Sequence, residues 1–285
     1  MNRPARWALA ASAVALLASC SATKFAYNRL DWLVSWEIGK YVELEGPSKV
    51  LFDSGLASLW QWHRSTQLAA YARDLREIAA AASGPVTPEQ IRGYVQRASD
   101  HGQRLFEEAI PPTAKVLQAL GDEQVKGLLQ KMAGERREEA EEDAERSPEA
   151  SRKRSTRNVS RSMRRWLGGL SDAQHALVRD WAAARRDDPA LWKRYGEQWG
   201  QSFEQTLAAR ARPDFEARLR EVFGDPQLPD SAAIEELGSH NRENYIGLLA
   251  KLAPTLTGEQ RRHLRKKLIG LAGDLEELAA SRPAA

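Results

Sequence analysis

Apolar residues recur at spacings of three and four along almost the whole of this chain of 285 residues, and this periodicity constrains the fold most strongly. No segment shows the alternation of apolar and polar residues that is typical of a strand. The C-terminal segment has the spacing of a heptad seam, with leucines at Leu264, Leu268, Leu271, Leu275 and Leu278. Such seams form where helices pack against one another. The pattern therefore predicts an all-α fold, an elongated multi-helix bundle with heptad-like packing.

Four short motifs mark where helices are expected to begin. In each, an apolar residue and a small residue precede two further positions and a glutamine, and the motifs start at Val86, Leu120, Leu170 and Leu256. In three of them the small residue is Ser or Thr, whose oxygen can accept a hydrogen bond from the first backbone N–H groups of a helix. The glutamine three residues later can reach back to the capping residue. The spacings between the motifs differ, which excludes a regular solenoid.

Proline and glycine mark the expected ends of helices. Helix ends are predicted at Gly84-Pro85, Pro111-Pro112, Asp188-Pro189, Gly224-Asp225-Pro226 and Pro254. Pro213 is expected to kink or break the segment between Leu191 and Phe223. Residues 47–82 contain no such interruption and are predicted to form one long helix.

The first twenty residues have the composition of an export signal. Arg3 and Arg6 form a positive N-terminal region, and residues 7–17 are an unbroken small or apolar run. This run is shorter than the ~20 apolar residues that a membrane-spanning helix needs. It ends in Leu17-Ala18-Ser19-Cys20, which resembles a bacterial lipobox. In that family of signals the cysteine thiol receives a diacylglyceryl group, and cleavage leaves the acylated cysteine as the new N-terminus. The alternative is an ordinary secretory signal with an incidental cysteine.

Cys20 is the only cysteine of the chain, so we expect neither a disulfide framework nor a thiolate metal site. Acylation would account for this single thiol in an exported protein. In Gram-negative lipoproteins an aspartate after the acylated cysteine usually means retention in the inner membrane. Because Ser21 stands there, the resemblance implies the periplasmic face of the outer membrane. We expect a signal peptide over residues 1–19, a lipidated N-terminus and short linker over 20–25, and a helical domain over 26–285.

One segment concentrates charge of each sign in turn. Residues 135–149 contain eight acids, and residues 152–165 contain seven bases and no acid. We expect a charged helical arm around residues 133–165, long and exposed to solvent, with an interruption near Ser147-Pro148. Opposite blocks of this kind are usually solvated faces that compensate each other, and they can fold back into a hairpin. The sharper hypothesis is a basic face that contacts an envelope protein or anionic lipid through Arg154, Arg157, Arg161 and Arg165.

The remaining composition excludes several classes of function. The chain has 42 basic and 39 acidic residues. Removal of the signal would also remove Arg3 and Arg6, so the positive and negative charges of the remaining chain nearly balance. We therefore expect no nucleic-acid partner. No metal-binding histidine motif, nucleophile elbow or phosphate-binding loop is present, and we expect no cofactor, no metal and no enzymatic activity.

Carboxylates are plentiful but follow the pattern of a surface, and only Asp31 and Glu37, near two tryptophans, are candidates for a site. An aromatic cluster is expected from Trp32, Trp36, Trp60 and Trp62. We interpret it as core packing, and the alternatives are a ligand groove or a membrane-facing belt.

Two resemblances to known families follow from these residues. Tyr27-Asn28-Arg29-Leu30-Asp31-Trp32-Leu33 directly after a lipobox resembles an uncharacterised family of Gram-negative lipoproteins with a domain of unknown function. The resemblance extends over most of the chain, through residues 166–174 and 256–260, and implies no activity and no catalytic residue. Leu256-Thr257-Gly258-Glu259-Gln260 is also similar to a motif of small periplasmic helical proteins, some of which are chaperones or stress sensors.

These observations predict a lipid-anchored, non-enzymatic interaction or structural protein that faces the periplasm from the outer membrane. A periplasmic chaperone-like or envelope stress-sensing protein is the alternative and would require a concave apolar surface. A third class is an enzyme, which would require converging polar residues in a cavity.

Overall fold

A computed structural model of the chain describes residues 20–224 and 226–281. Within these ranges every regular element is a helix and no strand occurs, which confirms the predicted all-α fold. The α-helices are α2 (Cys20–Tyr27), α3 (Leu30–Gly39), α4 (Gly46–Trp62), α5 (Leu68–Ala81), α6 (Pro88–Gln118), α7 (Asp122–Glu145), α8 (Pro148–Leu167), α9 (Asp172–Ala184), α10 (Pro189–Ala208), α11 (Phe215–Gly224), α12 (Ser231–Leu252) and α13 (Gly258–Ala280). A π-helical turn, η1 (His63–Gln67), joins α4 to α5, and a 3₁₀ turn, η2 (Ala253–Thr255), follows α12.

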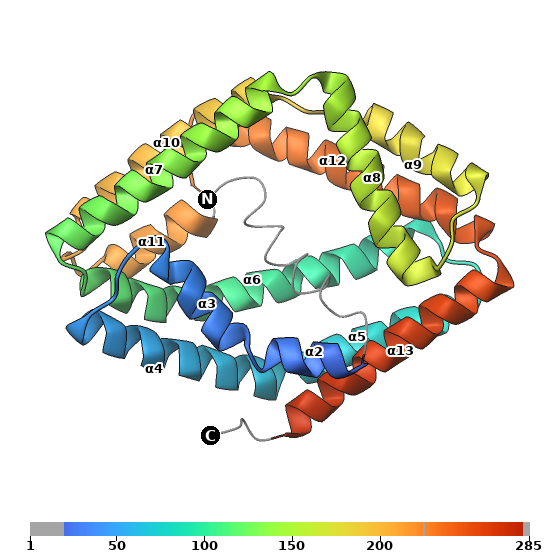
Figure 1. Cartoon of the computed structure of the whole chain (residues 1–285), viewed down its shortest axis with the longest axis horizontal. Coiled ribbons are helices and arrows are strands. Elements are labelled where there is room, and N and C mark those ends of the chain that lie inside the picture. The colour runs from blue at the N-terminus through green and yellow to red at the C-terminus, as the bar shows by residue number, and fades with distance from the viewer. Residues whose placement is uncertain (1–19, 225, 282–285) are drawn as a thin grey trace.

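The helices follow the outline of a lozenge, with neighbouring helices along each side (Figure 1). On the sides of this frame α4 packs on α6, α5 on α13, α7 on α10, and α8 on α9. The contact between α5 and α13 is the most extensive, and it buries Leu268, Leu271, Leu275 and Leu278 of the predicted heptad seam. The seam therefore packs as predicted.

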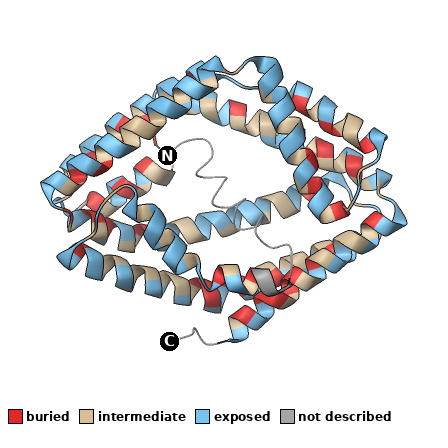
Figure 2. Cartoon of the chain, viewed as in Figure 1, coloured by how far each residue is buried: buried red, intermediate tan, exposed pale blue. Residues whose placement is uncertain are grey.

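Buried residues lie in separate groups along the frame rather than in one centre, as Figure 2 shows. The largest group joins α6, α7, α10 and α11 around the fully buried Leu207, Phe215 and Leu219. A second group joins α2, α5 and α13 around Leu68 and Ala72. The third joins α8, α9 and α12 and is described with the candidate site below.

The capping motifs start helices as predicted. The hydroxyls of Thr87, Ser171 and Thr257 accept hydrogen bonds from the backbone N–H of the glutamine three residues later, at 3.2 to 3.3 Å. Each glutamine in turn accepts from the backbone N–H of its capping residue. Gly121 has no capping side chain, but its N–H donates to Gln124 Oε1 at 2.9 Å. Because these hydrogen bonds join residues only three positions apart, the starts of these helices could be predicted from the sequence.

The helix end predicted at Pro111-Pro112 is wrong, because α6 continues through both prolines to Gln118. Two prolines remove two backbone donors from a helix, so a compensating contact is needed. Here α4 packs against the proline turn, and a Cβ placed on Gly55 would lie 2.8 Å from Pro112 Cβ. Pro213 behaves as expected: α10 ends at Ala208, and α11 begins at Phe215.

The interruption expected near Ser147-Pro148 is confirmed, and it divides the charged segment around residues 133–165 between two helices. The chain turns at Arg146 and Ser147, so α7 and α8 form two adjacent sides of the frame (Figure 1). Ser147 caps α8 through Oγ, which accepts from Ala150 N–H at 3.2 Å, and Pro148 occupies the first helical position. Both helices are held at their far ends, α7 by Val125 and Leu128 and α8 by residues from 160 to 167.

Candidate functional site

The N-terminal segment is ordered by packing on α13. The linker expected over residues 20–25 is helical, because α2 begins at Cys20. Thr23 is buried, and Lys24 Nζ donates to Glu277 Oε2 at 2.5 Å. Tyr27 is buried against Trp60, with ring centroids 5.4 Å apart. Residues 20–25 thus lie within α2, which packs on α13 through Thr23 and Lys24.

The π-helical turn contacts the first and the last helical segments that the structure describes. Tyr27 Oη lies 3.0 Å from His63 Nδ1, within hydrogen-bond distance. Arg64 Nη2 donates to Asn28 Oδ1 at 2.7 Å, and its Nη1 donates to Ser281 Oγ at 3.1 Å. π-Helical turns are rare and often occur at functional sites. Here the turn directs His63 and Arg64 inward together, which makes residues 63–64 a clamp between α2 and the end of α13.

Burial sets the protonation of this clamp. It lowers the pKa of His63 from 6.5 to about 4 and raises the pKa of Tyr27 to about 12. Both groups are therefore neutral at pH 7. Beyond them, Tyr71 contacts His63 edge-on at 5.5 Å and His101 at 4.6 Å, and His101 Nε2 lies 2.7 Å from Asp74 Oδ2. This chain of rings crosses from α5 to α6.

Helix α3 has no buried residue, although it is one of the most apolar helices of the chain. Trp32 and Trp36 are 61% and 51% exposed, and their rings stack at 6.3 Å. Phe25 of α2 is 66% exposed. Lys40 Nζ lies 3.6 Å from the centroid of the Trp36 ring. We call Phe25, Trp32, Leu33 and Trp36 the aromatic patch, since all four side chains are exposed.

The four tryptophans do not form the expected cluster. Trp60 packs with Tyr27 and His63, whereas Trp32 and Trp36 face solvent. Core packing is therefore the wrong interpretation for Trp32 and Trp36. Sequence periodicity missed this because residues 30–39 are apolar on more than one side: Leu30, Val34 and Ile38 are half-buried while the tryptophans point away.

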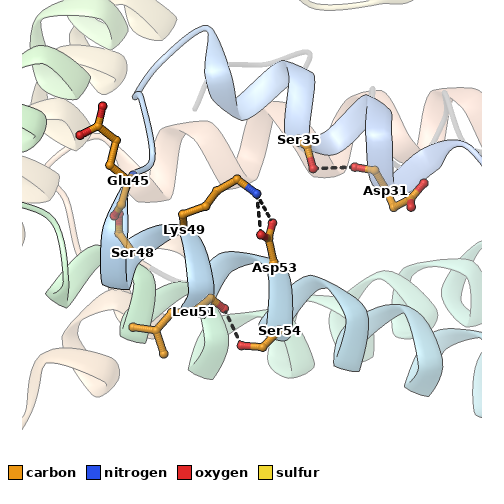
Figure 3. A network of polar contacts seen from close by, with 8 residues as sticks. All are labelled: Asp31, Ser35, Glu45, Ser48, Lys49, Leu51, Asp53 and Ser54. Carbon is orange, nitrogen blue, oxygen red and sulfur yellow. Dashed lines mark hydrogen bonds and ion pairs between the residues drawn. The ribbon is translucent and has the colours of Figure 1, made fainter. Parts of the chain in front are cut away.

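The polar contacts of α3 and α4 stay within each helix. In Figure 3, Ser35 Oγ donates to the backbone carbonyl of Asp31, and Lys49 Nζ donates to the Asp53 carboxylate. Glu37 accepts from Lys40 Nζ at 2.7 Å. The contact of the Glu37 carboxylate is therefore local, and the contact of Asp31 involves its backbone carbonyl rather than its carboxylate.

The four arginines of the predicted basic face lie on α8, and Arg165 also lines the cavity described below. Arg154, Arg157, Arg161 and Arg165 are all exposed. The acidic block on α7 uses some of its charge elsewhere: Glu135 accepts from Tyr41 Oη at 2.6 Å, and Asp143 pairs with Arg146. The geometry does not support a hairpin, since α7 and α8 diverge from their corner (Figure 1).

An apolar cavity of about 560 Å³ lies among α5, α6, α8, α12 and α13, and sequence reasoning did not find it. Its wall includes Leu75 of α5, Ile91 of α6, Met163 of α8 and Leu249 of α12. Trp166 borders it and packs against both the second and the third buried groups. The available signal was the apolar face of α8 at positions 163, 166 and 167, inside a segment dominated by charge.

Two of the capping glutamines meet beside this cavity. Gln174 Nε2 donates to Gln260 Oε1 at 2.9 Å, and Gln260 Nε2 donates to Gln174 Oε1 at 2.8 Å. Both side chains are buried. The two motifs that start α9 and α13, 86 residues apart in sequence, thus dock on each other. This contact gives the Leu256–Gln260 motif a structural role.

Neither a metal centre nor a membrane span emerges from the described ranges. In residues 20–224 and 226–281, no group of three metal-binding side chains comes together. Across the same part of the chain, every helix is too short or too polar to cross a bilayer.

Comparison with protein families matches residues 40–233 to the Family of unknown function (DUF6279). The chain belongs to this family. The DUF6279 match runs from the residue after α3 into α12 and contains the Leu170–Gln174 motif. The match confirms the resemblance to an uncharacterised family. Cys20 and residues 27–33 lie outside the match, so the lipobox and the N-terminal motif stay predictions. No curated protein and no solved structure matches the chain.

Proposed function

We propose that this DUF6279 protein is a lipid-anchored protein of the periplasmic face of the outer membrane, and that it acts through contacts rather than catalysis. Cys20 would carry the acyl chains, and the aromatic patch would rest in the membrane interface beside them. The observation that carries the proposal is the position of the patch. The most exposed aromatic side chains of the described residues, Phe25, Trp32 and Trp36, follow Cys20 within sixteen positions.

Physical chemistry favours this arrangement. Tryptophan is enriched at membrane interfaces, where an amphipathic ring contacts both headgroups and acyl chains. A helix that lies in the interface needs apolar area on one side and no spanning length. In α3, Trp32, Leu33 and Trp36 are exposed, whereas Leu30 packs at the edge of the second buried group and the helix has only a small contact with α4. Two acyl chains would provide stable anchoring, and the patch would fix orientation.

The anchor is tested by replacing the thiol. A Cys20→Ala variant should remain unprocessed or appear as a soluble periplasmic form, as judged by membrane fractionation and by the mass of the N-terminal peptide. The native protein should yield an acylated peptide beginning at residue 20. Maturation at residue 20 and outer-membrane fractionation of the variant would refute the anchor.

The patch is tested separately from the anchor. In the Cys20→Ala background, binding to vesicles of phosphatidylethanolamine and phosphatidylglycerol should fall when Trp32→Ser and Trp36→Ser are combined. Val50→Ser is the matched control, because Val50 is an exposed apolar residue on α4. Equal binding by all three proteins would refute the interfacial role of α3 and leave the anchor proposal standing.

We also propose that the basic face of α8 contacts an anionic envelope protein or lipid headgroup. Each base near an anionic surface contributes ~1 kcal/mol, and this attraction is screened by salt. Replacement of Arg154, Arg157, Arg161 and Arg165 by Gln should remove partners from an affinity capture at low salt. If the variant captures the same partners as the native protein, with the same salt dependence, the proposal is wrong and the basic face of α8 is only a solvated helical face.

A further inference from the structure

Two exposed surfaces of opposite charge flank the corner between α7 and α8. The acidic triplet consists of three exposed residues of α7, Glu138, Glu141 and Glu145. The basic triplet consists of three exposed residues of α8, Arg154, Arg157 and Arg161, which belong to the basic face. Both triplets have spacings of three and four, and residues at these spacings share one side of a helix. The two helices therefore present charges of opposite sign with the same periodicity.

Neither triplet is neutralised within its own chain. The ion pairs that form at the corner join Arg146 to Glu142 and to Asp143. In the part of the chain that the structure describes, no residue of either triplet takes part in an ion pair. An antiparallel hairpin would bring the triplets together, but α7 and α8 diverge from their corner (Figure 1). Surfaces that match in sign and spacing are therefore left to a partner outside the chain.

We propose that this partner is a second copy of the chain, and that two copies associate with the acidic triplet of each on the basic triplet of the other. The inference rests on the proposed contact of the basic face with an anionic partner and specifies that partner as α7 of another copy. Around a two-fold axis the same contact forms twice, which makes the surface self-complementary. Opposite charges also fix the orientation, because contact between like triplets is repulsive.

The frame can make this contact as it stands. Figure 1 shows α7 in front of α10 and α8 in front of α12, so both helices border the same side of the frame. A two-fold axis along the bisector of the corner exchanges the two directions and lays α7 of one copy antiparallel on α8 of the other. Helix α2 lies across the frame from the corner, so this axis keeps α2 of both copies at the same end (Figure 1). Two copies anchored in one membrane need this arrangement.

The contact should be weak and sensitive to salt. Exposed ion pairs each contribute little, because water and salt screen them. Confinement of both copies to one membrane raises their effective concentration and favours association. Co-capture of two differently tagged copies tests this expectation. The full-length chain is co-expressed with two different C-terminal tags, envelopes are solubilised in detergent, and one tag is captured while the other is quantified. Native copies should capture each other at low salt and about fivefold less at high salt.

Charge reversal identifies the second copy as the partner. The basic variant carries Glu138→Arg, Glu141→Arg and Glu145→Arg. The acidic variant carries Arg154→Glu, Arg157→Glu and Arg161→Glu. Copies of either variant alone should capture each other about tenfold less than native copies do, because both triplets then have one sign. A mixture of the basic and the acidic variant should restore capture, because opposite triplets meet again.

The matched control reverses three exposed bases of α13, through Arg262→Glu, Arg265→Glu and Lys266→Glu. This variant should capture itself as the native protein does. Far-UV circular dichroism and thermal unfolding establish that each variant folds. Equal loss in the α13 variant would assign the effect to net charge and overturn the proposal.

Three further results would overturn the second copy as partner. The first is that native copies fail to capture each other, or that the basic and acidic variants capture themselves as native copies do. The second is loss in both variants without restoration in their mixture, which would leave the basic face with a different anionic partner. The third is that the acidic variant loses binding to phosphatidylglycerol vesicles while its self-capture is unchanged, which would assign the basic face to a lipid headgroup.

Discussion

Gln174 and Gln260 each serve two purposes with one side-chain amide. Oε1 of each accepts the N–H of its own capping residue at 3.0 Å and also a hydrogen bond from the other glutamine. Nε2 of Gln260 donates further to the Gly169 carbonyl at 2.7 Å. Because the pair is buried, loss of Gln174 removes two hydrogen bonds from Gln260 and two from Thr255, and the desolvation of these polar groups is then less fully compensated.

Gln174→Ala should lower the free energy of unfolding by about 1–3 kcal/mol more than Gln90→Ala does. Gln90 makes the same capping bond on an exposed helix start, so its loss should cost at most ~1 kcal/mol. Urea unfolding of both variants measures the difference. Equal losses would mean that the glutamine pair adds nothing beyond capping.

His63 makes stability depend on pH. Its pKa is about 4 in the folded protein, below the usual 6.5, because burial disfavours the charged ring. The unfolded chain therefore takes up a proton more readily. The contribution of His63 to stability is complete above about pH 6.5 and is lost as pH falls towards 4, by up to about 3 kcal/mol.

His63→Gln should be less stable at neutral pH and should lose less stability between pH 6.5 and 4 than the native protein. His175→Gln, a change at a half-buried histidine, should retain the native slope. The measurement is chemical unfolding across this pH range. Parallel pH profiles for the native protein and His63→Gln would contradict the assignment.

At the scale of the element, α6 illustrates how packing overrides a local signal. Pro111 and Pro112 lack the N–H groups that would bond one turn back, and an isolated helix would break there. Close approach of α4 at Gly55 covers part of the proline turn, where Pro111 and Pro112 are half-buried. The helix therefore continues because a second helix covers its weakest point.

Gly55→Ala should destabilise the protein by about 1–3 kcal/mol, since a Cβ would lie 2.8 Å from Pro112 Cβ. Gly102→Ala makes the same change within α6, where no atom lies within 4 Å, and should stabilise by about 0.5–1 kcal/mol. Thermal or urea unfolding compares the two. A stabilising Gly55→Ala would show that α4 and α6 adapt without strain.

At the scale of the whole molecule, the core is divided among the sides of the frame. The heptad seam of α13 is buried along much of its length, whereas no residue from 130 to 159 is fully buried. The corner between α7 and α8 therefore contributes little apolar burial. Local opening is easiest where few apolar contacts must be broken.

Amide hydrogen exchange should reflect this division. Residues 137–158 should exchange among the fastest of the helical residues, and residues 268–278 of α13 among the slowest. Mass spectrometry of peptic peptides measures both in one experiment. Protection at the corner equal to that of α13 would show that the frame opens only as a unit.

The sequence by itself determined the helical fold and most helix starts. Capping bonds at Thr87, Ser171 and Thr257 join residues three positions apart, and the 3.6-residue period of each helix repeats locally, so both are readable without tertiary contacts. The exposed arginines of α8 followed in the same way from their spacing and the absence of acids.

Only the tertiary structure decided where those helices meet. The continuation of α6 past Pro112 and the packing of α2 on α13 depend on contacts between residues far apart in sequence. The outward direction of Trp32 and Trp36 likewise follows from which side of α3 the rest of the fold covers. The cavity is the clearest case, because residues from five helices line it and no local pattern distinguishes a leucine beside a void from one in a packed core. Burial is a property of neighbours, and neighbours are set by the complete fold.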